Sequence, residues 1–427
     1  EDVLDAVAAL VDKSLLAVED GDDERRYRLL ESTREFALEC LDAAGEREGA
    51  SERHCTYYAE LAANAHEAFW ETDSDQWTAA IRRDIENYRA AINWSLNHEV
   101  EYEVAATMVA DLRWFWLAAA QREGRAVVER AQVILPESAS VRTRGLLALT
   151  AGTLVENATV EVEEISKAER LLAAGADEKT HAEALIALAA AVGNTGKLVE
   201  SVEIAERAVA AARSGGIPRQ IGSMLSSAAY RMACAGDIDR SRSLFDEAEP
   251  LVRRSGDRAA LARLQVIRAE LLFASGDVAQ ALTCVREAGI IYRERRNELW
   301  LGATLLNEAA YLIAENDLAA AWGAAREVLE LAQQHEDPLT AAVAIGHLAR
   351  VAAEGDQASA ARLLGYVNSA YARAGSLREP TEQRGYDRAL ELIRAALPED
   401  RVAALMLQGA ALSPRHAAED ALAIAKP

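Results

Sequence analysis

The stretch from Gly193 to Ser201, GNTGKLVES, comes nearest in this sequence to a nucleotide-binding motif. A phosphate-binding loop needs four residues between its glycines and a Ser or Thr after its lysine, so that amides and a hydroxyl reach phosphate and metal. Here only Asn and Thr separate Gly193 from Gly196, and Leu198 follows Lys197. The stretch therefore does not predict nucleotide binding.

Other residue types that carry out chemistry are scattered along the chain. The seven histidines never stand at the HxxxH or HExxH spacing that places two imidazoles on one helix face for a metal ion. His54 and Cys55 are adjacent, and adjacent residues of a helix point about 100° apart. No GxSxG motif for a nucleophilic serine is present. We therefore expect a chain that is not an enzyme, with no catalytic, cofactor-binding or metal-binding residues.

A repeated turn signal shows which elements organise the chain. Gly196, Gly236, Gly276, Asn316 and Gly355 follow one another at intervals of 40, 40, 40 and 39 residues. A period of about 20 to 50 residues is typical of stacked helical repeats. Small residues keep the same period seven residues before the first four turns and, with one valine, twelve after them: Ala189, Ala229, Ala269, Ala309, Ala208, Ala248, Ala288 and Val328.

These positions match the tetratricopeptide pattern, lengthened from about 34 to about 40 residues per repeat. Gly or Asn in the left-handed region would end the first helix of each pair, and the following Asp would cap the second. The pattern predicts an all-α fold, a right-handed superhelix of tetratricopeptide-like helical hairpins, preceded by a small partial winged-helix α+β unit.

Four regions follow from these patterns. Residues 1–45 read as helix, hairpin and helix, with Ser32 as the N-cap of the second helix, and form the partial winged-helix unit. Residues 46–118 form a helical junction, 119–372 the repeat array and 373–427 a C-terminal helical cap. The sequence begins without Met, inside an amphipathic helix, so we expect a piece of a longer polypeptide.

The repeat pattern also indicates where the array would bind a ligand. In tetratricopeptide repeats the first helix of each hairpin lines the inner surface, and the candidate inner-groove residues here are Tyr230, Arg263, Glu270, Phe273 and Leu306. The groove would suit an apolar helix, a hydrophobic small molecule or a neighbouring domain of the same protein. Alternatively, a tight superhelix buries these side chains.

Tryptophans are concentrated in the junction, which holds Trp70, Trp77, Trp94, Trp114 and Trp116. Large aromatic side chains bury much area and so favour a tight contact between neighbouring units. Arg113, Trp114 and Trp116 are our candidates for coupling the array to the rest of the protein, and core packing is the simpler alternative.

Charge and composition exclude further classes of function. The formal net charge is -23, so the chain would repel a phosphate backbone, and we expect no direct contact with nucleic acid. No apolar run approaches the length of a membrane span. Four dispersed cysteines suit a reducing compartment, so we expect a cytoplasmic protein.

Several segments resemble the large actinobacterial STAND-type regulators of the AfsR-like or LuxR-like group. They are LVDKSLL (10–16), RYRLLESTREFALECL (26–41), RRDIENYRAAINWSL (82–96), RWFW (113–116) and EGRAVVERA (123–131). The resemblance implies an upstream ATPase domain that binds ATP or ADP and an output domain, both outside this sequence. Where relatives carry a nucleotide-sensing histidine, this chain has Leu29, Leu30 and Glu31.

The sequence is thus interpreted as the non-catalytic sensor arm of a multidomain transcriptional regulator. A protein partner or small-molecule inducer in the superhelix groove would control the ATPase switch and the output domain. The alternative is a stand-alone tetratricopeptide scaffold for a protein partner.

Overall fold

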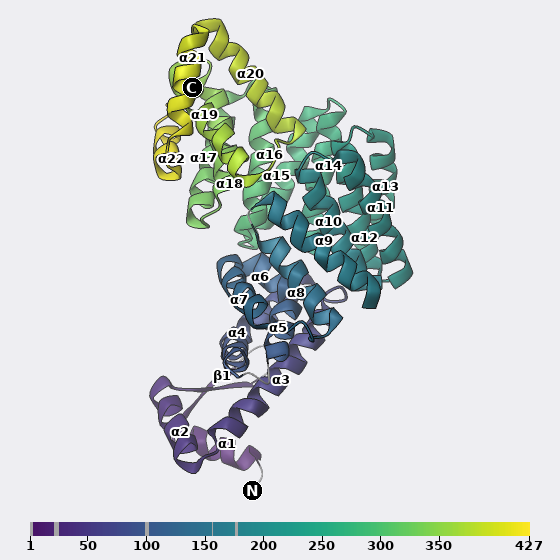
Figure 1. The fold of residues 1–427 in the computed structure, drawn as a ribbon, viewed down its shortest axis with the longest axis vertical. Coiled ribbons are helices and arrows are strands. Elements are labelled where there is room, and N and C mark those ends of the chain that lie inside the picture. Colours follow the sequence, from purple (N-terminus) through teal and green to yellow (C-terminus); the bar gives the residue numbers. More distant parts are fainter. Residues whose placement is uncertain (1–2, 21–24, 99–101, 156, 176–177) are drawn as a thin grey trace.

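The computed structural model describes residues 3–20, 25–98, 102–155, 157–175 and 178–427. These residues form 22 helices and one two-stranded sheet. Figure 1 shows an elongated molecule with the N-terminal unit at one end and the last helices, α20 to α22, at the other. The predicted all-α repeat architecture is confirmed.

The N-terminal unit has the expected order of helix, hairpin and helix. Its elements are α1 (Val3–Asp12), β1 (Leu16–Asp20), β2 (Arg25–Leu29) and α2 (Glu31–Ala44). The strands are antiparallel, with Leu16 opposite Leu29, and residues 21–24 of the expected hairpin lie outside the described residues. The expected Ser32 N-cap is wrong: Leu30 is extended and precedes α2 without a side-chain cap, so Ser32 falls inside the first helical turn.

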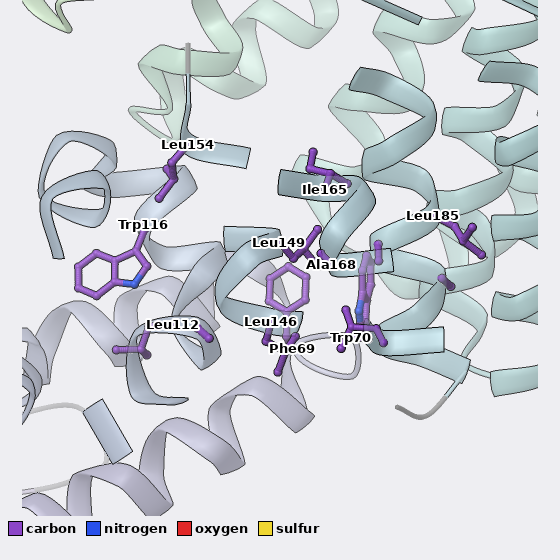
Figure 2. Packing of buried hydrophobic residues seen from close by; sticks show 14 of the residues in the cluster. Phe69, Trp70, Leu112, Trp116, Leu146, Leu149, Leu154, Ile165, Ala168 and Leu185 are labelled. Carbon is purple, nitrogen blue, oxygen red and sulfur yellow. The ribbon is translucent and has the colours of Figure 1, made fainter. Parts of the chain in front are cut away.

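The junction consists of two long helices followed by shorter ones. They are α3 (Arg47–Ala68), α4 (Ser74–Leu96), α5 (Tyr102–Asp111) and α6 (Arg113–Ala119), after which α7 (Gln121–Ile134) leads into the array. Trp77 is buried and its Nε1 donates to the Ala65 carbonyl oxygen at 2.7 Å. Figure 2 shows Phe69 and Trp70 among buried hydrophobic residues that include Leu149 and Ala168, so the core continues from the junction into the array.

Six consecutive helical hairpins follow within the described residues. They pair α8 (Val141–Leu154) with α9 (Ala158–Gly175), α10 (Glu178–Asn194) with α11 (Leu198–Gly215), α12 (Pro218–Cys234) with α13 (Ile238–Ser255), α14 (Arg258–Ala274) with α15 (Val278–Glu294), α16 (Glu298–Ala314) with α17 (Leu318–Gln334), and α18 (Pro338–Ala352) with α19 (Gln357–Ala374). The eight periodic small residues have no solvent exposure. They therefore let the paired helices approach closely, as the sequence predicts.

The turns within the hairpins obey the predicted rule with two exceptions. Gly196, Gly236 and Gly276 have φ between 86° and 87°, and Asn316 has φ 60°. Four aspartates that follow the turns accept a hydrogen bond from the amide three residues further on: Asp237, Asp277, Asp317 and Asp356. Gly355 does not adopt a positive φ, and Lys197 caps nothing. The left-handed rule is therefore wrong for the fifth turn, where α18 has 15 residues and the corresponding helices α10, α12, α14 and α16 have 17.

Three helices close the chain: α20 (Pro380–Ala396), α21 (Glu399–Ala410) and α22 (Pro414–Leu422). Helix α21 crosses α19 so closely that a Cβ atom at Gly365 would overlap the Met406 carbonyl, and one at Gly409 would overlap the Arg362 carbonyl. Buried residues from α14 to α22 form a second core cluster, which joins the cap to the last repeats.

Candidate functional site

The predicted inner-groove residues lie on the first helices of three successive hairpins. We call this surface the inner face: Tyr230 on α12, Arg263, Glu270 and Phe273 on α14, and Leu306 on α16. All five are buried or half-buried. Their partners come from the protein itself.

Three of these residues meet a segment that leads from α19 into α20. We call residues 376–386 the cap segment. The Tyr230 hydroxyl donates to Glu379 Oε1 at 2.6 Å. The Arg384 guanidinium lies 5.4 Å from the centre of the Phe273 ring, and the charges of Glu379, Glu382 and Arg384 act on Glu270. The inner face is therefore occupied by the protein's own chain at this point.

The two other predicted residues lie outside this contact. Arg263 donates to the Ser223 hydroxyl of the neighbouring repeat, and burial lowers the pKa of its guanidinium. Leu306 is half-buried against the core of the C-terminal half. The structure thus divides the five residues between a contact with the cap segment and packing between repeats.

The carboxyl groups beneath and within the cap segment are difficult to ionise. Burial raises the pKa of Glu270 to about 7, although a hydrogen bond of 2.6 Å from the Tyr311 hydroxyl acts to lower it. Burial and the nearby charge of Glu379 raise the pKa of Glu382 to about 7. Because a buried carboxylate is costly, both groups take up protons near neutral pH.

The predicted coupling residues divide in a similar way. Arg113 is 2% exposed and donates to Glu183 Oε2 of α10, whose Oε1 accepts from Trp70 Nε1 at 2.5 Å. Trp114 stacks on Phe69 with ring centres 4.6 Å apart, and its ring also faces the Arg113 guanidinium at 4.0 Å. Arg113 and Trp114 therefore belong to a buried contact between junction and array.

Trp116 belongs to the interior of the junction instead. Its ring is 1% exposed and its Nε1 donates to the Val109 carbonyl oxygen at 2.8 Å. A Cβ atom at Gly124 of α7 would overlap its side chain. Trp116 thus packs α6 against its neighbours, which is the simpler of the two interpretations of the tryptophan cluster.

Residues 69–75, which join α3 to α4 and include the first two residues of α4, make a second contact with the array, and we call them the junction loop. Arg219 of α12 donates to the carbonyl oxygens of Phe69 and Thr72, the latter at 2.6 Å, and pairs with Asp257 at 2.6 Å. Asp257 also accepts from the Ser74 hydroxyl at 3.1 Å. One buried arginine–aspartate pair therefore holds the loop.

Both partners of this pair have shifted pKa values. Burial opposes ionisation of Asp257, but the charge of Arg219 and hydrogen bonds from Ala260 and Ser74 outweigh it, so the pKa of the carboxyl is lowered. Burial lowers the pKa of Arg219, and Asp257 counteracts this. Arg295 adds contacts to Ser74 and Asp75 from the end of the α14–α15 hairpin.

A cavity of about 840 Å³ lies on the other side of the junction. One wall comes from α4, α6 and α7, and the other from the connections between hairpins, α15–α16 and α17–α18, with the adjoining helix ends. Arg122 and Glu336 form an exposed ion pair at 3.4 Å across it. The volume is within the range of small-molecule sites, which are about 300 to 1,000 Å³.

Sequence reasoning missed one partner in each of these contacts. Glu183, Arg219, Asp257 and Glu379 each bind a residue far away in the sequence. Only Asp257 carried a usable signal, because it follows a glycine and caps α14, as Asn297 and Asp337 cap helices at the same 40-residue interval. The others are ordinary polar residues of a helix or loop, whose partners depend on how far the superhelix turns.

Metal-binding clusters and membrane-spanning helices are both absent from the part of the chain that the structure describes. It contains no cluster of three or more His, Cys, Asp or Glu side chains able to hold a metal ion. None of its helices is both long and apolar enough to cross a membrane.

Comparison with known proteins gives a partial relationship in sequence. No protein-family model matches the chain. Over 123 residues, or 29% of its length, the chain is 38% identical to proteins of Mycobacterium bovis and Mycobacterium tuberculosis that are provisionally named HTH-type transcriptional regulators. The match spans 14% of each of these relatives.

Comparison with solved structures relates the fold to helical-repeat proteins. A Rap protein complexed with competence and sporulation factor matches 84% of this chain and 99% of its own, with a TM-score of 0.53 and 13% identity. A STAND protein with a tetratricopeptide repeat sensor from Pyrococcus horikoshii covers 92% of this chain and 60% of its own, with a TM-score of 0.40 and 16% identity. The chain thus has the helical-repeat fold of the Rap protein and resembles, over part of its length, HTH-type transcriptional regulators.

Proposed function

We propose that this chain is the non-catalytic sensor and interaction arm of a multidomain transcriptional regulator of the STAND type. Its array binds a protein, peptide or small-molecule inducer, and the junction transmits binding to an ATPase and an output domain elsewhere in the polypeptide. The motif resemblance and the partial match to HTH-type regulators support this assignment. The net charge of -23 favours an output on DNA that another domain performs.

The contact between junction and array is the observation that carries the proposal. Arg113 reaches Glu183 of α10 through a buried ion pair. The junction loop accepts hydrogen bonds from Arg219 of α12, and its Asp75, 55% exposed, pairs with Arg295 of the α14–α15 hairpin. Buried ion pairs tolerate little displacement, because a charge that loses its partner there is strongly destabilised. A change in superhelical pitch is therefore passed to the junction as a rearrangement of these pairs.

An inducer must bind one arrangement of the arm more tightly than the other to shift the regulator between states. Repeat arrays suit this requirement, since each hairpin contacts only its neighbours and small rotations add up along the superhelix. The Rap protein with this fold is itself solved with a bound factor, which supports a partner-binding role for the array.

The test uses the full-length regulator and a reporter gene under its control. Arg113→Met combined with Trp114→Ala should make reporter output insensitive to the growth conditions that switch the unaltered regulator, because the junction no longer follows the array. Trp300→Ala is the matched control, since Trp300 is 39% exposed on α16 of the array, outside the junction. Switching that survives the junction substitutions would refute the proposal and favour a stand-alone scaffold.

A further inference from the structure

The cap segment runs along the inner face as a peptide bound in a groove would. The Leu377 amide donates to the Asn194 carbonyl oxygen at the end of α10, 3.1 Å away. Glu379 then accepts from Tyr230 of α12 at 2.6 Å, and Arg384 lies over Phe273 of α14. The segment thus contacts the first helices of three successive repeats, in order, through its backbone, a carboxylate and a cation.

Tyrosine–carboxyl pairs recur around this contact, and the first of the three joins the cap segment to the inner face. Tyr230 with Glu379, Tyr371 with Glu382 and Tyr311 with Glu270 are each joined by a hydrogen bond of 2.6 Å. Two of the three carboxyls belong to the cap segment. Glu379 and Glu382 also form a capping box at the start of α20, in which the Glu379 amide donates to Glu382 Oε2 at 2.9 Å.

These contacts define what the inner face recognises. It offers a hydroxyl donor at Tyr230, an aromatic ring at Phe273 and a backbone acceptor at Asn194. They fit an acidic peptide that enters in an extended conformation and then begins a helix at a glutamate two residues after an apolar side chain.

The cap segment is also fastened in a way that permits release. None of residues 376–386 is buried, and beyond them Ala389 and Ile393 are the buried residues of α20, with Leu390 and Leu392 half-buried against the same core. The cap segment itself therefore buries little apolar area. Glu270, Glu379 and Glu382 lie close together, and Arg378 and Arg384 supply opposite charge from the same segment. Elements with few apolar contacts open locally at lower free energy than the rest of a protein.

We propose that the cap segment is a built-in ligand of the inner face, which competes with an acidic peptide or protein segment of the same chemistry for this site. The array then binds its partner only when the segment leaves, and α20 is the element that moves. The regulatory role of this competition rests on the proposed sensor function. The competition itself can be measured in the isolated chain.

Cys234 provides a natural probe of this exchange. Its thiol lies beside Tyr230, Glu270 and Glu379, and burial raises its pKa to about 11. Cys284, buried on α15, reports whether the array itself stays folded. Alkylation by iodoacetamide, followed by mass spectrometry of the peptides that contain each cysteine, measures both sites in one experiment.

The first experiment compares the whole chain with a double variant that carries Glu379→Ala and Arg384→Ala, which lacks the side-chain contacts with Tyr230 and Phe273. We expect alkylation of Cys234 to become at least about tenfold faster, because losing these contacts raises the open population, while Cys284 is unchanged. Glu391→Ala is the matched control, since Glu391 pairs with Arg388 on the exposed face of α20, and it should leave both rates unchanged. Equal Cys234 rates in the chain and the double variant would overturn the proposal.

The second experiment adds a fluorescent peptide with the sequence of residues 374–388 and follows its anisotropy. The peptide should bind the double variant and not the unaltered chain, at concentrations up to about 1 mM, the order of effective concentration that a short linker provides. A peptide in which both Glu379 and Glu382 are alanine should bind neither. Equal binding to both proteins, or binding to neither, would overturn the proposal. Loss of regulator switching in the reporter assay tests only the proposed function and does not alter these readouts.

Discussion

Substitution of Arg113 by methionine removes one charge from the buried contact between junction and array. Glu183 would then remain 3% exposed with no cation beside it and with only the Trp70 indole N–H as a described donor. Methionine keeps much of the length of the arginine side chain, so the change removes charge and hydrogen bonding with little loss of volume. The junction should be destabilised because the carboxylate loses its partner.

The expected magnitude follows from the burial of both groups. Breaking a fully buried ion pair by removing one partner costs about 3 to 5 kcal/mol, whereas an exposed pair contributes about 0 to 1 kcal/mol. Arg240→Met is the matched control, since Arg240 and Glu206 form an ion pair with side chains 55% and 44% exposed. With an m-value of about 2 kcal/mol/M, Arg113→Met should lower the urea midpoint by roughly 2 M, and Arg240→Met by less than about 0.5 M.

Tryptophan fluorescence is the appropriate assay, because five of the seven tryptophans lie in residues 46–118 and report the junction. Far-UV circular dichroism in the same titration reports all helices. Arg113→Met should shift the fluorescence transition further than the circular dichroism transition. Adding Glu183→Gln should restore about 2 kcal/mol, since glutamine is neutral and keeps an acceptor for Trp70. An unshifted fluorescence midpoint, or a double variant less stable than Arg113→Met, would refute this account.

Three further predictions concern the cap and the repeats. The pKa of Glu270 is raised to about 7 from its ordinary 4.5, so the contribution of Glu270 to stability is complete below about pH 4.5 and is lost as pH rises through 7. The melting temperature should therefore fall between about pH 5 and pH 8. Glu270→Gln, which keeps an acceptor for Tyr311, should flatten that dependence, and an equally steep curve for this variant would contradict the shift. Gly365→Ala should destabilise the cap by about 1 to 3 kcal/mol in urea unfolding, because the added Cβ meets the backbone of Met406. Gly323→Ala in α17 is the control: a Cβ there meets nothing within 4 Å, so this variant should be more stable by roughly 0.5 to 1 kcal/mol. Equal effects of the two substitutions would show that α19 and α21 cross less closely than the structure has them. Asp277→Ala removes the cap of α15 and should cost about 1 kcal/mol by the same measurement, and an unchanged midpoint would exclude this role.

The features that the sequence predicted are those set by local interactions. A turn at Gly236 and a capping Asp237 depend on a few neighbouring residues, so their period is visible in the sequence. The helix-contact alanines follow for the same reason. Even here the rule has limits, since the turns between hairpins place Arg296 and Glu336 at φ 52° and 54°, where Gly216 and Gly256 stand in earlier repeats. Stacking of the hairpins imposes the conformation there, whatever the residue.

The contacts that make up the candidate site depend on the path of the whole superhelix. Tyr230 and Glu379 are 149 residues apart, and Ser74 and Asp257 are 183 apart. Periodicity predicts which face of α12 carries Tyr230, but it does not say that the C-terminal cap returns to that face. The sequence therefore placed the five candidate residues on the first helices of the hairpins and left their partner unidentified.

The most direct test of the central claim is hydrogen exchange of the junction loop in the full-length regulator, measured with ADP and with a non-hydrolysable ATP analogue. If the array controls the switch through this loop, the amides of residues 69–75 should differ in protection by at least about tenfold between the two states, since the arginine pairs must rearrange. Amides of α8 and α9 in the same sample should remain unchanged. Equal protection of the junction loop in both nucleotide states would contradict the account.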